Sequence, residues 1–88
     1  MRWAARTDAN QAEIVKALRN AGRSVVSLHR VGQGVPDLLV GNNGLNFLLE
    51  VKSEGGDLSP GQQEFADSWR GEVATVRSPE EAIEATQD

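Results

Sequence analysis

The sequence predicts an α/β fold with a small mixed four-stranded sheet flanked by helices, in the order α-β-β-β-α-β-α. Short apolar runs rich in β-branched residues are separated by stretches with the 3.6-residue apolar period of helices. Two Ser-Pro dipeptides stand where helices would begin, and an Asn-Gly pair separates two of the apolar runs. The 88 residues are enough for one domain, which we expect to span residues 1–88.

The first helix is expected over about residues 9–21. Asp8 can act as its N-cap residue, with Gln11 as the capping-box partner three positions later. Gly22 follows the last apolar position of the helix and is a natural C′ residue.

Three strands are expected next, over residues 24–30, 37–40 and 46–52. Gly32 and Gly34 interrupt the strand pattern between the first and second strands. We expect them to allow a sharp turn and a close approach of the backbone to a ligand. The segment 41–44, Gly-Asn-Asn-Gly, is a strong signal for a hairpin turn between the second and third strands.

The remaining elements are a helix, a short strand over residues 72–76 and a last helix. Ser59, Pro60 and Gln62 form an N-cap, a first-turn proline and a capping-box partner. Ser78 begins the same pattern again, with Glu81 in the partner position. The tail from about residue 86 is expected to be frayed.

Charge is distributed unevenly along the chain, although the total is only −4. Residues 1–30 carry six basic residues against two acidic ones, a net +4, whereas residues 31–88 carry three against eleven, a net −8. A DNA-facing side built from the N-terminal third is one interpretation, and a solvated basic helix beside an acidic tail explains the charge equally well. The basic residues of that third are Arg2, Arg6, Lys16, Arg19, Arg23 and Arg30.

Composition excludes several classes of protein. Without cysteine the chain has neither a disulfide nor a thiolate zinc site, and with His29 as its single histidine it has no histidine cluster. No segment approaches the roughly 18 apolar residues of a membrane span. The N-terminus lacks a secretory pattern, so a cytoplasmic protein with no membrane partner is expected.

The chemistry of the chain is concentrated in Gly-Val-Pro-Asp, residues 34–37, and Glu-Val-Lys, residues 50–52. Both motifs lie on predicted strands, and Glu50 and Lys52 project from the same face of an extended chain. Two converging carboxylates, Asp37 and Glu50, are the ligands that a hard cation such as Mg²⁺ prefers, with phosphate and water completing its shell. The plainer alternative is that Asp37 caps a strand while Glu50 and Lys52 form a surface pair.

In this element order the pattern resembles the core of the PD-(D/E)XK nuclease superfamily. Within that superfamily, Gly-Val-Pro-Asp-Leu-Leu-Val (34–40), Leu-Glu-Val-Lys (49–52) and Leu-Ser-Pro-Gly-Gln (58–62) resemble the virus-type replication-repair nuclease family, VRR-NUC. The stand-alone members of that family are small phage and bacterial proteins. The resemblance covers about residues 9–82, and its motifs together are fairly specific.

The resemblance implies roles for individual residues. Asp37 and Glu50 would hold Mg²⁺ or Mn²⁺, with the backbone carbonyl of Val51 as a third protein ligand. Lys52 would orient or activate the attacking water.

Two further residues could belong to the site. Gln62 shares a predicted helical face with Phe65 and Trp69, and the resemblance also places a glutamine there, although a capping box alone would explain it. Glu13 resembles the first-helix acid that many nucleases of this superfamily direct at the metal, and a solvated glutamate explains it nearly as well.

The function expected from these residues is metal-dependent hydrolysis of DNA phosphodiester bonds. The residues expected to contact DNA are Arg6, Lys16, Arg19, Arg23 and Arg30. The resemblance points to a homodimer that cuts four-way junctions or other branched DNA. A flap-type or sequence-nonspecific nuclease is a near alternative. A non-catalytic nucleic-acid-binding or assembly module with the same fold is the alternative from another class.

Overall fold

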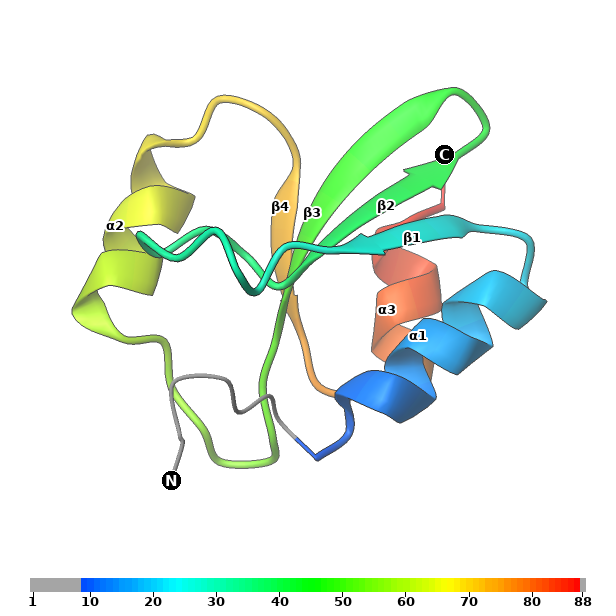
Figure 1. Ribbon diagram of the computed structural model, residues 1–88, viewed down its shortest axis with the longest axis horizontal. Coiled ribbons are helices and arrows are strands. Elements are labelled where there is room, and N and C mark those ends of the chain that lie inside the picture. The colour runs from blue at the N-terminus through cyan, green and yellow to red at the C-terminus, as the bar shows by residue number, and fades with distance from the viewer. Residues whose placement is uncertain (1–8, 88) are drawn as a thin grey trace.

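The structure is a computed structural model that describes residues 9–87. Figure 1 shows a sheet with helices on both sides. The elements are α1 (Gln11–Asn20), β1 (Ser24–Ser27), β2 (Leu38–Asn42), β3 (Leu45–Val51), α2 (Pro60–Ser68), β4 (Val73–Val76) and α3 (Pro79–Ala85). The predicted class and order of elements are therefore confirmed.

The four strands lie side by side in the order β1-β2-β3-β4. β1 pairs with β2 and β2 with β3 in antiparallel fashion, whereas β3 and β4 are parallel. A parallel pair needs a crossover connection, and here the crossover contains α2. The sheet is thus mixed, as expected.

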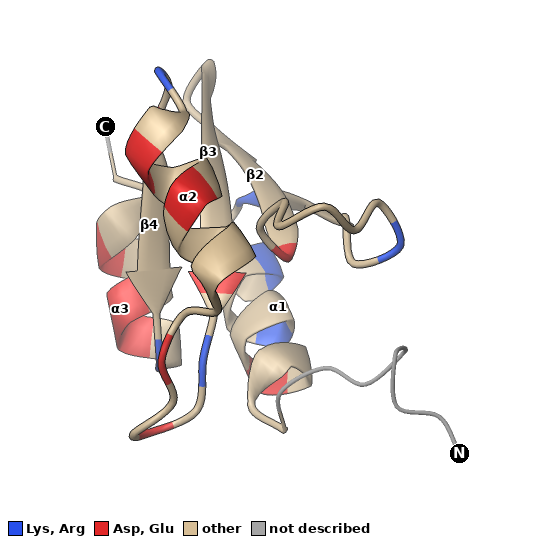
Figure 2. Cartoon of the chain, turned by 90° about the vertical axis from the view of Figure 1, so that its left-hand side faces the viewer, with Lys and Arg blue, Asp and Glu red and all other residues tan. Residues whose placement is uncertain are grey.

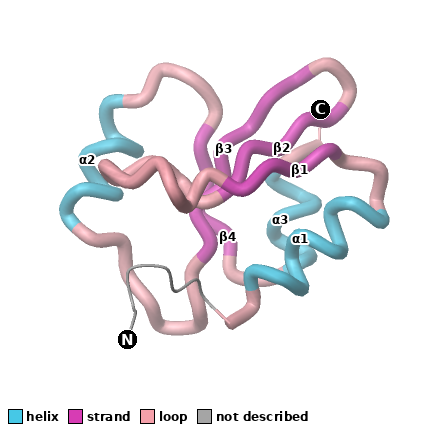
Figure 3. Tube along the Cα trace, viewed as in Figure 1, coloured by secondary structure: helices cyan, strands magenta, loops and turns pink. Residues whose placement is uncertain are grey.

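The first face of the sheet carries the hydrophobic core and is covered by α1 and α3 (Figure 3). Ile14 and Leu18 of α1 are fully buried, because their spacing of four residues places them on one face of the helix. They pack in one cluster with strand residues at alternate positions, the arrangement that a strand period of two requires. The strand members of this cluster are Val25, Leu38, Val40, Phe47, Leu49, Val51 and Val76.

The second face of the sheet is covered only in part. α2 stands over it, apart from the other two helices (Figure 1), and none of the residues of α2 is buried. Alternation along β3 places Leu48 and Glu50 on this face, as the sequence predicted. The candidate catalytic residues therefore lie on the less densely packed side of the sheet.

The first helix begins later than predicted. Residue 10 is its N-cap position, and no side chain caps the helix there, so the predicted pairing of Asp8 with Gln11 is not its start; Asp8 itself lies outside the described residues. The end of the helix was predicted correctly, since Gly22 N donates to Arg19 O (3.0 Å) and Arg23 N to Leu18 O (2.9 Å), the two bonds of a Schellman motif.

The boundaries of the strands also differ from the prediction by one to three residues. β1 ends at Ser27 instead of residue 30, because the chain turns where Val31 N donates to Leu28 O (2.9 Å). The hairpin between β2 and β3 is tighter than the predicted four-residue turn. Only Asn43 (φ 58°) and Gly44 (φ 82°) form it, both with the positive φ of a type I′ turn.

The N-terminal caps of the later helices are as predicted, with one difference. Ser59 accepts a hydrogen bond from Gln62 N, and Gln62 completes the capping box by accepting from Ser59 N. Ser78 accepts from Glu81 N, but the Glu81 carboxylate accepts from Arg77 N (2.8 Å) instead of Ser78 N. Within residues 9–87, no helix has both the length and the apolar character needed to cross a membrane.

Candidate active site

The two predicted carboxylates lie on neighbouring strands of the second face. Leu38 pairs with Leu49 in the β2–β3 ladder, so Asp37 and Glu50 stand opposite each other one position further along. Cβ atoms of directly opposite residues in antiparallel strands lie about 5 Å apart. The structure thus brings together two residues that are separated by twelve intervening residues in the sequence.

Asp37 is held by a backbone amide of the neighbouring strand. Its Oδ2 accepts a hydrogen bond from Val51 N at 2.8 Å, and its own carbonyl accepts from Leu28 N at 2.7 Å. A carboxylate that receives a backbone N–H on one oxygen is fixed in orientation, while its other oxygen can face a cation. Asp37 therefore ties together β2, β3 and the end of β1.

Glu50 is held from the opposite side by α2. Only 4% of Glu50 is exposed, and its Oε2 accepts a hydrogen bond from Gln62 Nε2 at 3.0 Å. The same Gln62 side chain uses its Oε1 to accept from Ser59 N at 2.8 Å. Gln62 therefore has both of the roles considered for it. Its Oε1 caps α2, and its Nε2 contacts the candidate site at Glu50.

The loop between β1 and β2 lies directly against the first turn of α2. Gly34 has a φ of +76°, and a Cβ built on it would lie 2.5 Å from the carbonyl oxygen of Gly61. The expected close approach at this glycine is therefore found, to the chain's own helix, while the approach to a ligand stays a prediction. This contact places the residue before Gln62 beside the loop that leads into Asp37.

Lys52 follows the end of β3, and its backbone is held by contacts that the sequence did not indicate. Asn10 donates through Nδ2 to Lys52 O (3.2 Å) and to Arg77 O (2.9 Å). Arg77 Nη1 in turn donates to Ser53 O and to Gly56 O, both at 2.7 Å, which fixes the loop after Lys52. These partners lie 21 to 67 positions apart in the chain, so no local pattern could have revealed them.

The donor atoms at this position fit a hard divalent cation. Among the described residues, no three or more His, Cys, Asp or Glu side chains form a group that could hold a metal ion. Mg²⁺, however, is commonly bound by one or two carboxylates, with phosphate oxygens and water filling the other positions. Asp37 and Glu50, with a backbone carbonyl such as that of Val51, match this requirement, whereas they lack the nitrogen or sulfur donors that zinc prefers.

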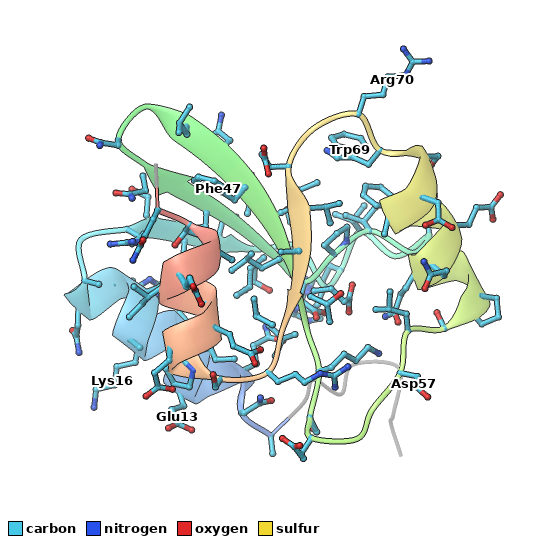
Figure 4. The ribbon with its side chains drawn as sticks, turned by 180° about the vertical axis from the view of Figure 1, so that it is seen from behind. Glu13, Lys16, Phe47, Asp57, Trp69 and Arg70 are labelled. Atoms are coloured by element: carbon cyan, nitrogen blue, oxygen red, sulfur yellow. The ribbon has the colours of Figure 1, made fainter. Side chains whose placement is uncertain are left out.

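Glu13 is not brought to the two carboxylates. It is exposed on α1, and Figure 4 shows its side chain directed outward near that of Lys16. No hydrogen bond joins it to Asp37 or Glu50 among the contacts of the described residues. The interpretation of Glu13 as a solvated glutamate agrees with this position.

Two arginines of the predicted DNA-facing side, Arg19 and Arg23, form hydrogen bonds within the protein. Arg23 donates to Thr86 Oγ1, Ala21 O and Ile83 O, which fastens α1 to α3, and Arg19 donates to Val25 O. Lys16 and Arg30 are exposed, whereas Arg6 lies outside the described residues.

Charged residues are unevenly distributed over the elements. Figure 2 shows basic residues on α1, which also carries the acidic Glu13, and on the loop between β1 and β2, while α2 and α3 carry acidic residues. A hollow of about 580 Å³ runs along α1 beside β1, lined in part by Lys16, Arg19 and Ser27. A phosphate backbone would meet positive charge on this side.

Comparisons of the chain with protein-family models, with curated proteins and with solved structures found no match. The assignment of the site therefore depends on the positions of Asp37, Glu50, Lys52 and Gln62, and on their chemistry.

Proposed function

We propose that this chain is a metal-dependent endonuclease that hydrolyses phosphodiester bonds in DNA. The observation that carries the proposal is the opposed pair of carboxylates, Asp37 and Glu50. Each has one oxygen held by a separate hydrogen-bond donor, Val51 N and Gln62 Nε2. Mg²⁺ is commonly bound in proteins by one or two carboxylates together with phosphate oxygens and water, so two carboxylates on opposed strand positions support a metal-binding role for the pair.

Each residue has a distinct task in this proposal. Asp37 and Glu50 hold Mg²⁺ or Mn²⁺, with the Val51 carbonyl as a further ligand. The chemistry supplied by the ion is Lewis-acid activation of the scissile phosphate and of water. Lys52 positions the nucleophilic water and stabilises the negative charge that develops on the phosphate. Gln62 keeps Glu50 in the orientation that binding requires.

The order of elements and the positions of these residues support membership of the PD-(D/E)XK superfamily, and of its VRR-NUC family in particular. DNA as substrate implies a cytoplasmic location in a bacterial or phage-infected cell. The favoured substrate is branched DNA, such as a four-way junction cut by paired sites.

A homodimer would supply the paired sites. β1 lies at the edge of the sheet, and Val26 on this strand is 55% exposed, so within residues 9–87 a strand edge and apolar surface remain uncovered. A two-fold interface would relate two active sites by the same axis that relates the scissile strands of a junction. A dimer by analytical ultracentrifugation and symmetric nicks across the junction are expected. A monomer that cuts linear duplex as readily as junctions would contradict both expectations.

The activity is tested with labelled linear duplex, flap and four-way junction DNA, each incubated with Mg²⁺, with Mn²⁺ and with chelator. Glu50→Gln is compared with Glu84→Gln, because Glu84 is an exposed glutamate on α3, which covers the opposite face of the sheet. We expect metal-dependent cleavage by the wild type and by Glu84→Gln, and none by Glu50→Gln. DNA binding without cleavage under any metal condition would favour the non-catalytic module instead. Equal cleavage of flap, linear and junction DNA would favour the nonspecific nuclease.

A further inference from the structure

Beside the two carboxylates, the second face of the sheet has an apolar pocket that the catalytic proposal does not use. Its volume is about 370 Å³, and it lies between α2 and the strands β2 and β3. Leu39 and Leu48 form its floor, while Phe65 and Trp69 line it from α2 and from the residue that follows this helix. Val35, Asn46 and Glu72 are among the other residues that line it.

The pocket lies next to the candidate active site along the same face of the sheet. Leu39 and Leu48 are cross-strand partners, as Asp37 and Glu50 are one pair further along the same face. Two residues along a strand correspond to about 7 Å. The pocket is therefore within reach of the nucleotide next to a phosphate held at the carboxylates.

The aromatic pair at the pocket is well suited to stacking. Phe65 and Trp69 lie nearly parallel, with ring centroids 5.0 Å apart and an interplanar angle of 16°. Trp69 remains 48% exposed, and Figure 4 shows it beneath the loop that leads from α2 to β4. Gly71 leaves room for the indole, because a Cβ there would lie only 2.8 Å from Trp69 Nε1. An aromatic ring kept at the surface in a defined position can receive a second flat ring.

We propose that this pocket binds the unstacked nucleobase adjacent to the scissile phosphate, a proposal that depends on the endonuclease function above. The aliphatic floor and the aromatic rings would take the faces of the base, and Asn46 and Glu72 at the rim can hydrogen-bond its edge. The pocket is at the small end of the range for ligand sites, which suits a single flat heterocycle. Because a base can enter only when it is unpaired, the pocket would select DNA with unpaired nucleotides, as at branches and flaps.

The fluorescence of Trp69 gives a direct test that does not require cleavage. The chain has two tryptophans, so in a Trp3→Phe background the emission reports on Trp69 alone. Lys52→Ala is added to slow turnover, and the protein is titrated in Mg²⁺ with a six-nucleotide single-stranded DNA. A matched DNA of the same length, with abasic sites in place of its central bases, serves as the second probe. We expect quenching by the first probe and little by the second, and equal quenching by both would overturn the proposal.

Variants then test whether the pocket contributes affinity. Trp69→Ala should weaken binding of the six-nucleotide DNA roughly 5- to 100-fold, the range that loss of one base–aromatic stack produces. Trp69→Phe should recover most of the affinity, because it keeps an aromatic face. Leu45→Ala is the matched control, since Leu45 is 47% exposed, close to the 48% of Trp69, and does not line the pocket. Equal binding by Trp69→Ala and Leu45→Ala would overturn the proposal.

The two proposals fail in distinguishable ways. Quenching that depends on the base, without cleavage of any DNA by the wild type, would reject the endonuclease function and leave a base-binding pocket. Metal-dependent cleavage that is unchanged in Trp69→Ala would reject the pocket and leave the endonuclease. A wild-type dimer that dissociates only in Trp69→Ala would show that a second copy of the chain covers the pocket, which also overturns the proposal.

Discussion

The contact between Gly34 and Gly61 predicts that Gly34→Ala lowers the stability of the protein much more than Gly32→Ala does. Gly34 and Gly32 have similar backbone angles, φ +76° and +72°. A Cβ at Gly34 would lie 2.5 Å from Gly61 O and 2.9 Å from Gly61 C, whereas a Cβ at Gly32 meets no atom within 4 Å. Comparing the two alanine variants therefore separates the cost of the backbone angle from the cost of the collision.

The magnitudes follow from these two causes. A left-handed backbone costs an alanine about 1–2 kcal/mol, so Gly32→Ala should lower the free energy of unfolding by that amount. Gly34→Ala should lose a further 1–3 kcal/mol, roughly the usual cost of overpacking, because the atoms that its Cβ would meet are backbone atoms of Gly61 that cannot rotate away. For a domain of this size each kcal/mol lowers Tm by about 4–8 °C.

Urea denaturation and DNA cleavage together check this prediction. Gly34→Ala should unfold at a clearly lower urea concentration than Gly32→Ala with a similar m-value. It should also cut DNA more slowly while still folded, because the collision pushes the first turn of α2, and with it Gln62, away from Glu50. Equal unfolding midpoints for the two variants would refute the close approach of this loop to α2.

Three further outcomes test the site and the DNA surface. Asp37→Ala and Glu50→Ala should each abolish binding of Mn²⁺ by titration calorimetry, and undiminished affinity in both would remove the metal assignment. Lys52→Ala should keep its binding of metal and of DNA while cleavage falls by roughly 10²-fold or more, the effect of losing one electrostatic donor; near-normal turnover would make it a surface lysine. Lys16→Ala with Arg30→Ala should lower the slope of log binding constant against log salt concentration by about 0.9 per lost phosphate contact, and an unchanged slope would place the DNA elsewhere.

The order of elements could be predicted because each signal for it is local. The two Ser-Pro helix starts, the Asn43-Gly44 turn and the alternation along β3 depend on neighbours within a few positions of the chain. The opposed carboxylates could be predicted for a related reason. Once two strands form a hairpin, their register determines which residues face each other, and here it places Asp37 opposite Glu50.

The errors arose where distant contacts override local preference. Residues 28–30 have the composition of a strand, but the chain turns there so that the following loop can reach α2 at Gly34. The predicted start of α1 was wrong because the N-cap residue is Asn10. Its side-chain amide donates to the carbonyls of Lys52 and Arg77 and does not cap its own helix. The contact of Arg23 with DNA stays a prediction, and composition could not reveal that its guanidinium donates to Thr86 Oγ1 and Ile83 O.

The stability of α2 and the geometry of the site are linked through Gln62. None of the residues of α2 is buried, so little apolar burial holds this helix to the sheet, and its local opening should cost less free energy than that of α1 or α3. Opening α2 would break the bond from Gln62 to Glu50 and separate Phe65 and Trp69 from Leu39 and Leu48. A ligand that bridges the carboxylates and the apolar pocket would therefore hold α2 in place. Amide hydrogen exchange in α2 should then slow when DNA and metal bind together, while exchange in α1 should change little.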